Sequence, residues 1–67
     1  MKNKSSLVLG RRVGEKVLVG TPPNHVIIQV LGVSADRADI HFLAPNDIPI
    51  DRWEVAERKG RLPESGV

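Results

Sequence analysis

The 67-residue sequence contains no cysteine and no tyrosine, and its only aromatic side chains are Phe42 and Trp53. The lack of cysteine excludes a disulfide framework and a thiolate-bound metal. The shortage of aromatics excludes the binding of single strands by base stacking on a sheet, as in RRM and OB domains. The two histidines, His25 and His41, match no metal-binding spacing. We therefore expect no metal and no cofactor.

Long apolar runs are also missing. No stretch approaches the roughly 20 residues of a membrane-spanning helix, and the opening MKNKSS leads into no signal peptide. We therefore expect a cytoplasmic protein without a membrane partner. The serines lie in the termini or in a predicted turn, and no nucleophile–base pair can be recognised. No catalytic residue is assigned, and an enzyme is the least favoured class.

The chain is short for a stable monomer. Hydrophobic residues make up 40% of the sequence, but a chain of this length buries only roughly 60% of its unfolded surface. Because no disulfide or metal adds stability, a second copy of the chain is the simplest source of further buried area. The sequence therefore predicts one domain that forms an oligomer.

Charge is distributed unevenly, although the net formal charge is only +2. Residues 1–12 contain four basic side chains and no acidic one, whereas residues 13–50 contain two basic and four acidic side chains. Residues 51–61 again have an excess of one base. If folding or dimerisation brings the two basic zones together, they form a surface suited to a polyanion.

Short apolar runs separated by turn residues predict a mostly β fold with five strands and one short C-terminal helix. Residues 1–6 are expected to be a flexible leader, 7–60 the folded domain, and 61–67 a disordered tail. The expected strands are residues 7–12, 16–20, 25–33, 37–44 and 48–50, followed by a helix over about 52–59 that stops at Gly60.

The alternation of side chains also predicts which faces are buried. Residues 25–33 carry apolar side chains on both faces, which is typical of a strand covered on both sides. Residues 37–44 alternate instead, as in a strand with one buried face. There, Ala38, Ile40 and Phe42 are expected inside, and Arg37, Asp39 and His41 outside.

Prolines and capping residues predict where regular structure breaks. The segment TPPN, residues 21–24, is expected to be irregular because its two prolines lack backbone donors. Pro49 confines the last strand to a sheet edge, or to pairing through its other face only. Asp51 and Glu54 have the spacing of a capping box, so we expect Asp51 to cap the helix.

Arg11 and Arg12 lie side by side at the end of the first strand. The simplest interpretation is that they are solvated charges, and the alternative is that they bind a ligand. Because neighbouring strand residues face opposite sides, at most one of them shares a surface with Leu9. Arg52 lies at the predicted helix start, where the helix dipole slightly disfavours a cation. This placement favours a functional reason for Arg52.

Three segments, LVLGRRVGEKVLVG, VLGV and LAPNDIPIDRWEV, resemble the carbon storage regulator (CsrA/RsmA) family of bacterial RNA-binding translational regulators. The family opening is similar to L-x-L-[ST]-R-R-x-G-E, and an A-P segment and R-x-E-[VI] follow later. The resemblance implies an intertwined, strand-exchanged homodimer with a β-sandwich or barrel-like core. In that dimer, the first strand of one chain lies beside the last strand of the other.

The resemblance also implies a function, namely the binding of GGA motifs in single-stranded or hairpin-loop RNA. Binding in mRNA leaders represses translation or alters mRNA stability, and small RNAs with many such motifs titrate the protein. The alternative is a divergent interaction module that binds a protein partner or modulates a family member. The positions that match the family's RNA contacts are Leu9, Arg11, Arg12, Pro45, Ile50 and Arg52.

The sequence departs from the family pattern at several positions in the predicted strands. Gly10 replaces a Thr or Ser, and Asp39 replaces a residue that is commonly basic. Pro49 and Asp51 change the last strand, and residues 21–25 lengthen the connection between the second and third strands. An acid at Asp39 close to bound RNA would repel phosphate.

Overall fold

The computed structural model of the chain describes residues 4–63. Residues 1–3 of the expected leader and 64–67 of the expected tail lie outside the described residues. The fold is mostly β with one short C-terminal helix, as predicted, and its first strand begins at Lys4, three residues before the predicted start. The elements are β1 (Lys4–Arg12), β2 (Lys16–Thr21), β3 (Asn24–Gln29), β4 (Arg37–Pro45), β5 (Ile50–Arg52) and α1 (Trp53–Arg58).

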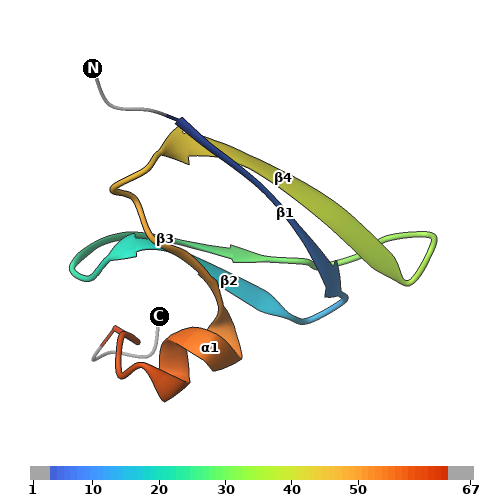
Figure 1. The fold of residues 1–67 in the computed structure, drawn as a ribbon. Coiled ribbons are helices and arrows are strands. Elements are labelled where there is room, and N and C mark those ends of the chain that lie inside the picture. Colours follow the sequence, from blue (N-terminus) through green and yellow to red (C-terminus); the bar gives the residue numbers. More distant parts are fainter. Residues whose placement is uncertain (1–3, 64–67) are drawn as a thin grey trace.

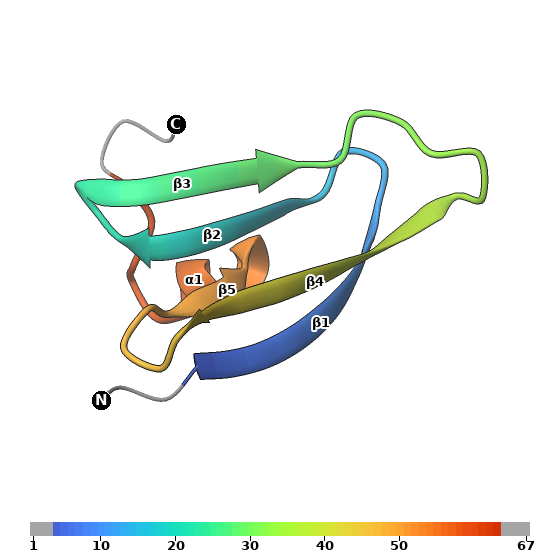
Figure 2. The same ribbon diagram turned by 90° about the horizontal axis from the view of Figure 1, so that it is seen from above.

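The strands form two antiparallel sheets (Figure 1). One sheet contains β1 and β4, and the other has the order β3-β2-β5. The β1–β4 pairing runs from Lys4 opposite Pro45 to Arg12 opposite Arg37. Seen from above, β1 and β4 lie to one side of β2 and β3, with β5 between them (Figure 2). The helix α1 lies below the three-stranded sheet in Figure 1, where it contacts β5 and β2.

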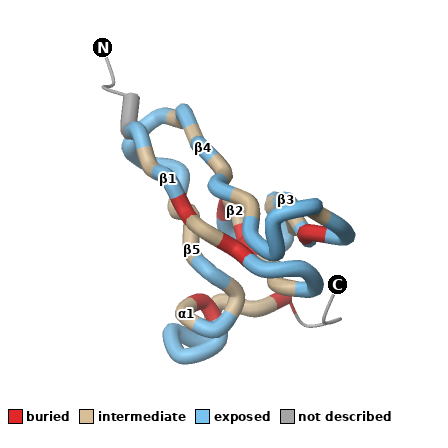
Figure 3. Tube along the Cα trace, turned by 90° about the vertical axis from the view of Figure 1, so that its right-hand side faces the viewer, coloured by how far each residue is buried: buried red, intermediate tan, exposed pale blue. Residues whose placement is uncertain are grey.

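The fully covered core is small (Figure 3). The central strand β2 supplies its two largest fully buried side chains, Val17 and Leu18. Within residues 6–63, the other buried apolar side chains are Leu9, Val30, Ala56 and Pro63. Single residues from β1, the β3–β4 connection, α1 and the segment after α1 therefore complete a core that is centred on β2.

The predicted alternation in β4 is confirmed. Its exposed and half-buried residues alternate along all nine positions. The face that points inward is half-buried. The half-buried side chains include Ala38, Ile40 and Phe42, and the exposed ones include Arg37, Asp39 and His41.

The prediction that residues 25–33 form a strand buried on both faces is wrong. The strand β3 ends at Gln29, and 57% of Val26 is exposed. The reason is the position of β3 at one edge of its sheet, where β2 is its only strand partner in the part of the chain that the structure describes. Beyond the strand, Val30 keeps two backbone hydrogen bonds, from Gly14 N to its carbonyl (2.7 Å) and from its own N to Glu15 O (3.1 Å).

The β2–β3 connection is tighter than predicted. Thr21 and Asn24 are paired strand residues, so only Pro22 and Pro23 form the turn, and the prediction that all of 21–24 is irregular is wrong at both ends. Gly20, with φ of 89°, precedes the turn, and a β-carbon there would lie 2.8 Å from Asn24 O. Glycine at this position therefore permits the close hairpin.

The last strand lies two residues later than predicted, at Ile50–Arg52 instead of 48–50. Pro49 has no backbone donor for a ladder, but its carbonyl accepts a hydrogen bond from Gly20 N at 2.8 Å. Regular pairing with β2 therefore starts at Ile50, opposite Val19. The expected edge position is confirmed, because β5 is the outer strand of its sheet.

The predicted capping box is also wrong. The N-cap of α1 is Arg52, and no side chain caps the helix. Asp51 is a strand residue, and its carboxylate binds Lys59 and Arg61 instead. The Asp51 carboxylate, which the local spacing assigned to helix capping, therefore forms ion pairs beyond the helix instead.

The predicted stop at Gly60 is confirmed. Gly60 adopts a φ of 72°, its N donates to Glu57 O at 3.1 Å, and Arg61 N donates to Ala56 O at 2.9 Å. These two bonds form a Schellman motif, which satisfies the last carbonyls of a helix. The chain then turns back towards β2 and β5, where Arg61 contacts Asp51 and the Gly20 carbonyl.

Candidate nucleic-acid interface

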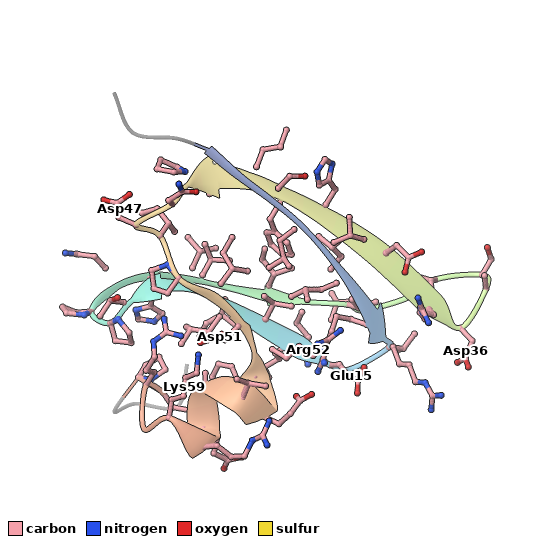
Figure 4. The ribbon with its side chains drawn as sticks, viewed as in Figure 1. Glu15, Asp36, Asp47, Asp51, Arg52 and Lys59 are labelled. Atoms are coloured by element: carbon pink, nitrogen blue, oxygen red, sulfur yellow. The ribbon has the colours of Figure 1, made fainter. Side chains whose placement is uncertain are left out.

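The end of the molecule where β1 turns into β2 brings three arginines together. Arg11 and Arg12 end β1, and the turn after them is closed by a hydrogen bond from Glu15 N to Arg12 O at 3.0 Å. Arg52 arrives from β5, where it pairs with Val17 near the start of β2. Figure 4 labels Arg52 and Glu15 at this end of the molecule. We call the region formed by Arg11, Arg12 and Arg52 the arginine end.

The side chain of Arg11 points inward and is only 4% exposed. Its Nη1 donates to Glu54 Oε2 at 2.9 Å, and its Nη2 donates to Glu54 Oε1 at 3.0 Å. Its Nε lies 3.7 Å from Glu15 Oε1 and has no hydrogen-bond partner among the described residues. The paired contact with Glu54 is the fork geometry in which arginine binds a carboxylate most strongly. It ties the end of β1 to the first turn of α1.

This pair shifts both ionisation equilibria towards the charged forms. The hydrogen bond from Arg11, with a smaller contribution from the backbone N–H of Glu54 itself, lowers the pKa of Glu54 from 4.5 to about 2. The same hydrogen bond raises the pKa of Arg11 above its usual value, against the effect of burial. Both groups are therefore ionised at neutral pH, and the ion pair is intact.

Arg12 and Arg52 are exposed. The backbone N–H of Arg12 donates to Glu15 Oε1 at 2.7 Å. The Arg12 guanidinium takes no part in this hydrogen bond. Within residues 4–63, neither guanidinium has a hydrogen bond or an ion pair. The alternation along β1 thus separates the two neighbours, as predicted: Arg11 is buried with Leu9, and Arg12 faces outward.

The other three predicted site residues do not all lie at the arginine end. Leu9 is 6% exposed and belongs to the core. Ile50 is half-buried at the start of β5. Pro45 is exposed, but it pairs with Lys4 at the opposite end of β1. One chain therefore brings Arg11, Arg12 and Arg52 together and leaves Pro45 distant from them.

The two basic zones of the sequence do meet, but acids are interleaved with them. Glu54 neutralises Arg11, and Glu15 lies beside it. In the second zone, Asp51 is paired with Lys59 at 3.3 Å and with Arg61. The surface that remains for a polyanion is therefore made by the exposed arginines and is smaller than the count of basic residues suggests.

Trp53 does not present a bare ring for base stacking. It is half-buried at the start of α1, and the ammonium nitrogen of Lys16 lies 4.6 Å from the ring centroid. This is the geometry of a cation–π contact. The contact joins the start of β2 to α1, and it agrees with the exclusion of a stacking platform from composition.

Sequence reasoning missed the two acids that organise this end. The spacing of Glu54 from Asp51 predicts a helix-capping role, and Glu15 belongs only to the R-R-x-G-E block. The spacing of 43 residues between Arg11 and Glu54 gives no local signal. The available signal was Arg11 itself, because a strand pattern that places an arginine on the side of Leu9 requires a buried counter-charge.

Residues 4–63 contain neither a metal-binding cluster nor a membrane-spanning helix. No group of three or more His, Cys, Asp or Glu side chains is placed to hold a metal ion. In the same part of the chain, no helix has the length and apolar character needed to cross a membrane.

The fold and this site define a small, mostly β protein whose exposed arginines gather where two strands and a helix meet. Comparison with known proteins identifies the class. Residues 7–61 match the model described as "CsrA: Global regulator protein family", and the chain therefore belongs to the CsrA global regulator family. Members of this family are regulators that generally bind RNA and form dimers, and they are not known as enzymes. No solved structure matches the chain.

Proposed function

We propose that this protein is a cytoplasmic homodimer that binds GGA motifs in mRNA leaders or in titrating small RNAs. By doing so, it represses translation or alters mRNA stability. The observation that carries the proposal is the presence of two exposed arginines, Arg12 at the end of β1 and Arg52 at the end of β5, in a chain of a regulatory RNA-binding family. Neither guanidinium has a hydrogen bond or an ion pair among residues 4–63, and the charge of Arg52 acts on the carboxylate of Glu54.

The chemistry of these groups suits RNA without aromatic stacking. A guanidinium can donate two parallel hydrogen bonds to guanine O6 and N7 or to phosphate oxygens. Among the described residues, β1 pairs only with β4 and β5 pairs only with β2. Their unpaired backbone donors and acceptors can therefore contact unstacked base edges.

Within this proposal, the six predicted site residues have different roles. Arg12 and Arg52 contact the RNA, and Ile50 lies beside Arg52 on β5. Arg11 and Leu9 act as positioning residues, because both are buried and hold β1 in place. Pro45 lies at the far end of β1 from Arg12. It joins the site only if a second chain brings its Pro45 to this end, as in a strand-exchanged dimer.

The experiment is a gel shift with a hairpin that carries GGA in its loop and a matched hairpin that carries CCA. We expect the wild-type protein to prefer GGA. Arg52→Ala should abolish most of the binding, whereas Arg58→Ala, an exposed arginine in the last turn of α1, should have little effect. Light scattering should show that all three proteins keep the same mass.

Two outcomes would contradict the proposal in different ways. Equal affinity for the two hairpins would remove the sequence-specific part and leave general polyanion binding. No binding to either hairpin, together with a mixed dimer with a family member in native mass spectrometry, would favour the alternative of a protein-interaction module.

A further inference from the structure

The outward face of the β1–β4 sheet ends in two arginines that face each other. Arg12 on β1 is directly opposite Arg37 on β4, and both are exposed. Like charges that face each other across strands destabilise a sheet. Among residues 4–63, the only acid that contacts either guanidinium is Asp39, which receives hydrogen bonds from Arg37 Nε at 3.2 Å and Nη2 at 3.0 Å. The charge of Arg12 remains uncompensated.

Gly10 determines where the guanidinium of Arg37 lies. Gly10 is opposite Asp39 in the sheet. A β-carbon on Gly10 would lie 2.6 Å from Arg37 Nε and 2.8 Å from its Cζ. The guanidinium therefore occupies the space that any side chain at position 10 would take. The group in the way is the end of a flexible side chain, so a residue larger than glycine would move it without disturbing the backbone.

The pair of Arg37 and Asp39 leaves donors free for a ligand. The Arg37 side chain is 64% exposed and that of Asp39 is 63% exposed. Two of the five guanidinium N–H donors bind Asp39, and three remain. An ion pair this exposed contributes little to stability. Its main effect is to orient the Arg37 side chain across β1, on the face where Arg12 also lies.

We propose that Arg12 and Arg37 together bind a phosphodiester group of the RNA, and that Gly10 permits this by leaving room for Arg37 across β1. The inference rests on the proposed function, since its ligand is the backbone of the bound RNA. With Asp39 included, the cluster carries one net positive charge. The acid at position 39 then orients a phosphate-binding arginine instead of simply repelling the RNA.

The first test compares Arg37→Gln with Arg58→Gln, which removes one exposed arginine from the end of α1. Fluorescence anisotropy with the GGA hairpin is measured over a range of salt concentrations. We expect Arg37→Gln to weaken binding by roughly threefold to tenfold and to reduce the slope of log K against log salt by about 0.7, the value for one lost phosphate contact on a single strand. Arg58→Gln should leave affinity and slope close to those of the wild type.

The second test couples Gly10 to Arg37. In the wild-type background, Gly10→Ser displaces the guanidinium and should weaken binding to about the level of Arg37→Gln. In the Arg37→Gln background, the same substitution should have little further effect, because the group that it displaces is absent. Thermal midpoints should stay close to that of the wild type, which shows that binding and not folding has changed.

The outcomes separate this inference from the proposed function. If the wild type prefers GGA and Arg37→Gln matches Arg58→Gln in affinity and slope, the phosphate-binding pair is wrong while the proposed function stands. Equal effects of Gly10→Ser in both backgrounds would contradict the role of Gly10. If the wild type binds neither hairpin, the proposed function fails, and this inference fails with it.

Discussion

At the scale of single residues, the contact between Arg11 and Glu54 is the main link between β1 and the helix. The guanidinium is 4% exposed, whereas 55% of the Glu54 side chain remains exposed. A buried guanidinium without a counter-charge is strongly unfavourable. Replacing Glu54 therefore destabilises the fold indirectly, because the buried Arg11 guanidinium loses its counter-charge.

The same pair predicts a pH dependence of stability. The pKa of Glu54 falls from 4.5 to about 2 on folding, so its contribution is complete above about pH 4.5 and is lost as the pH falls through about 2. Glu54→Gln should therefore lower the free energy of unfolding at pH 7 by about 1 kcal/mol, a modest value because solvent screens the exposed carboxylate. The difference from the wild type should shrink between pH 5 and pH 2 in urea unfolding.

A matched control is Glu57→Gln, an exposed carboxylate in the same helix. Its effect on the free energy of unfolding should be small. A wild-type advantage over Glu54→Gln that stays constant from pH 7 to pH 2 would show that the Arg11–Glu54 charge pair does not contribute as described.

At the scale of elements, α1 is a helix of six residues, too short to be stable by its own propensity. Its start has no side-chain cap, and it is held instead by tertiary contacts of Arg11 with Glu54 and of Lys16 with Trp53. Its end has a complete Schellman motif at Gly60. The two ends of α1 are thus stabilised in different ways, the first by distant residues and the second by local geometry.

The end of α1 gives a prediction with an internal control. Gly60 has a φ of 72°, and a β-carbon there would meet nothing within 4 Å. Gly60→Ala should therefore cost about 1 kcal/mol through backbone strain alone. Gly32→Ala also meets nothing within 4 Å, without a positive φ, and should stay within about 0.5 kcal/mol of the wild type. Urea unfolding at one fixed protein concentration measures both, and equal effects would contradict the strain argument.

The elements also show how far sequence patterns reach. The alternation of apolar and polar residues along 37–44 correctly predicted β4 and its two faces, because a strand with one covered face has a clear period of two. The same reasoning failed for β3, since apolar residues on both faces do not reveal whether a second layer exists within the chain. The helix stop at Gly60 was predictable because the Schellman motif is local.

The candidate site was predictable only in part. Alternation required Arg11 and Arg12 to face opposite sides, but it could not decide which one is buried. That choice depends on Glu54, which is distant in the sequence. Asp51 was misassigned for the same reason, because its spacing to Glu54 fits a capping box while its actual partners, Lys59 and Arg61, lie beyond the helix. The position of Arg37 over Gly10 depends on the β1–β4 register, which the alternation along either strand alone does not reveal.

At the scale of the whole molecule, the chain leaves much apolar surface uncovered. The exposed fraction is 83% for Leu31, 69% for Leu43, 59% for Val8 and 57% for Val26. The inward face of β4 is only half-buried. Exposed apolar surface of this kind marks interaction sites. Since the family generally forms dimers, a second copy of the chain is the partner that best accounts for it.

We therefore predict that folding and dimerisation are coupled. The small core of one chain offsets its conformational entropy only marginally, and a second copy adds buried area. Light scattering at micromolar concentration should give twice the mass of one chain, and the thermal midpoint should rise with protein concentration, because association stabilises only the folded state. A one-chain mass with a midpoint that does not depend on concentration would contradict the dimer. Since Pro45 and Arg12 lie at opposite ends of β1, the same result would also exclude a site that contains both residues.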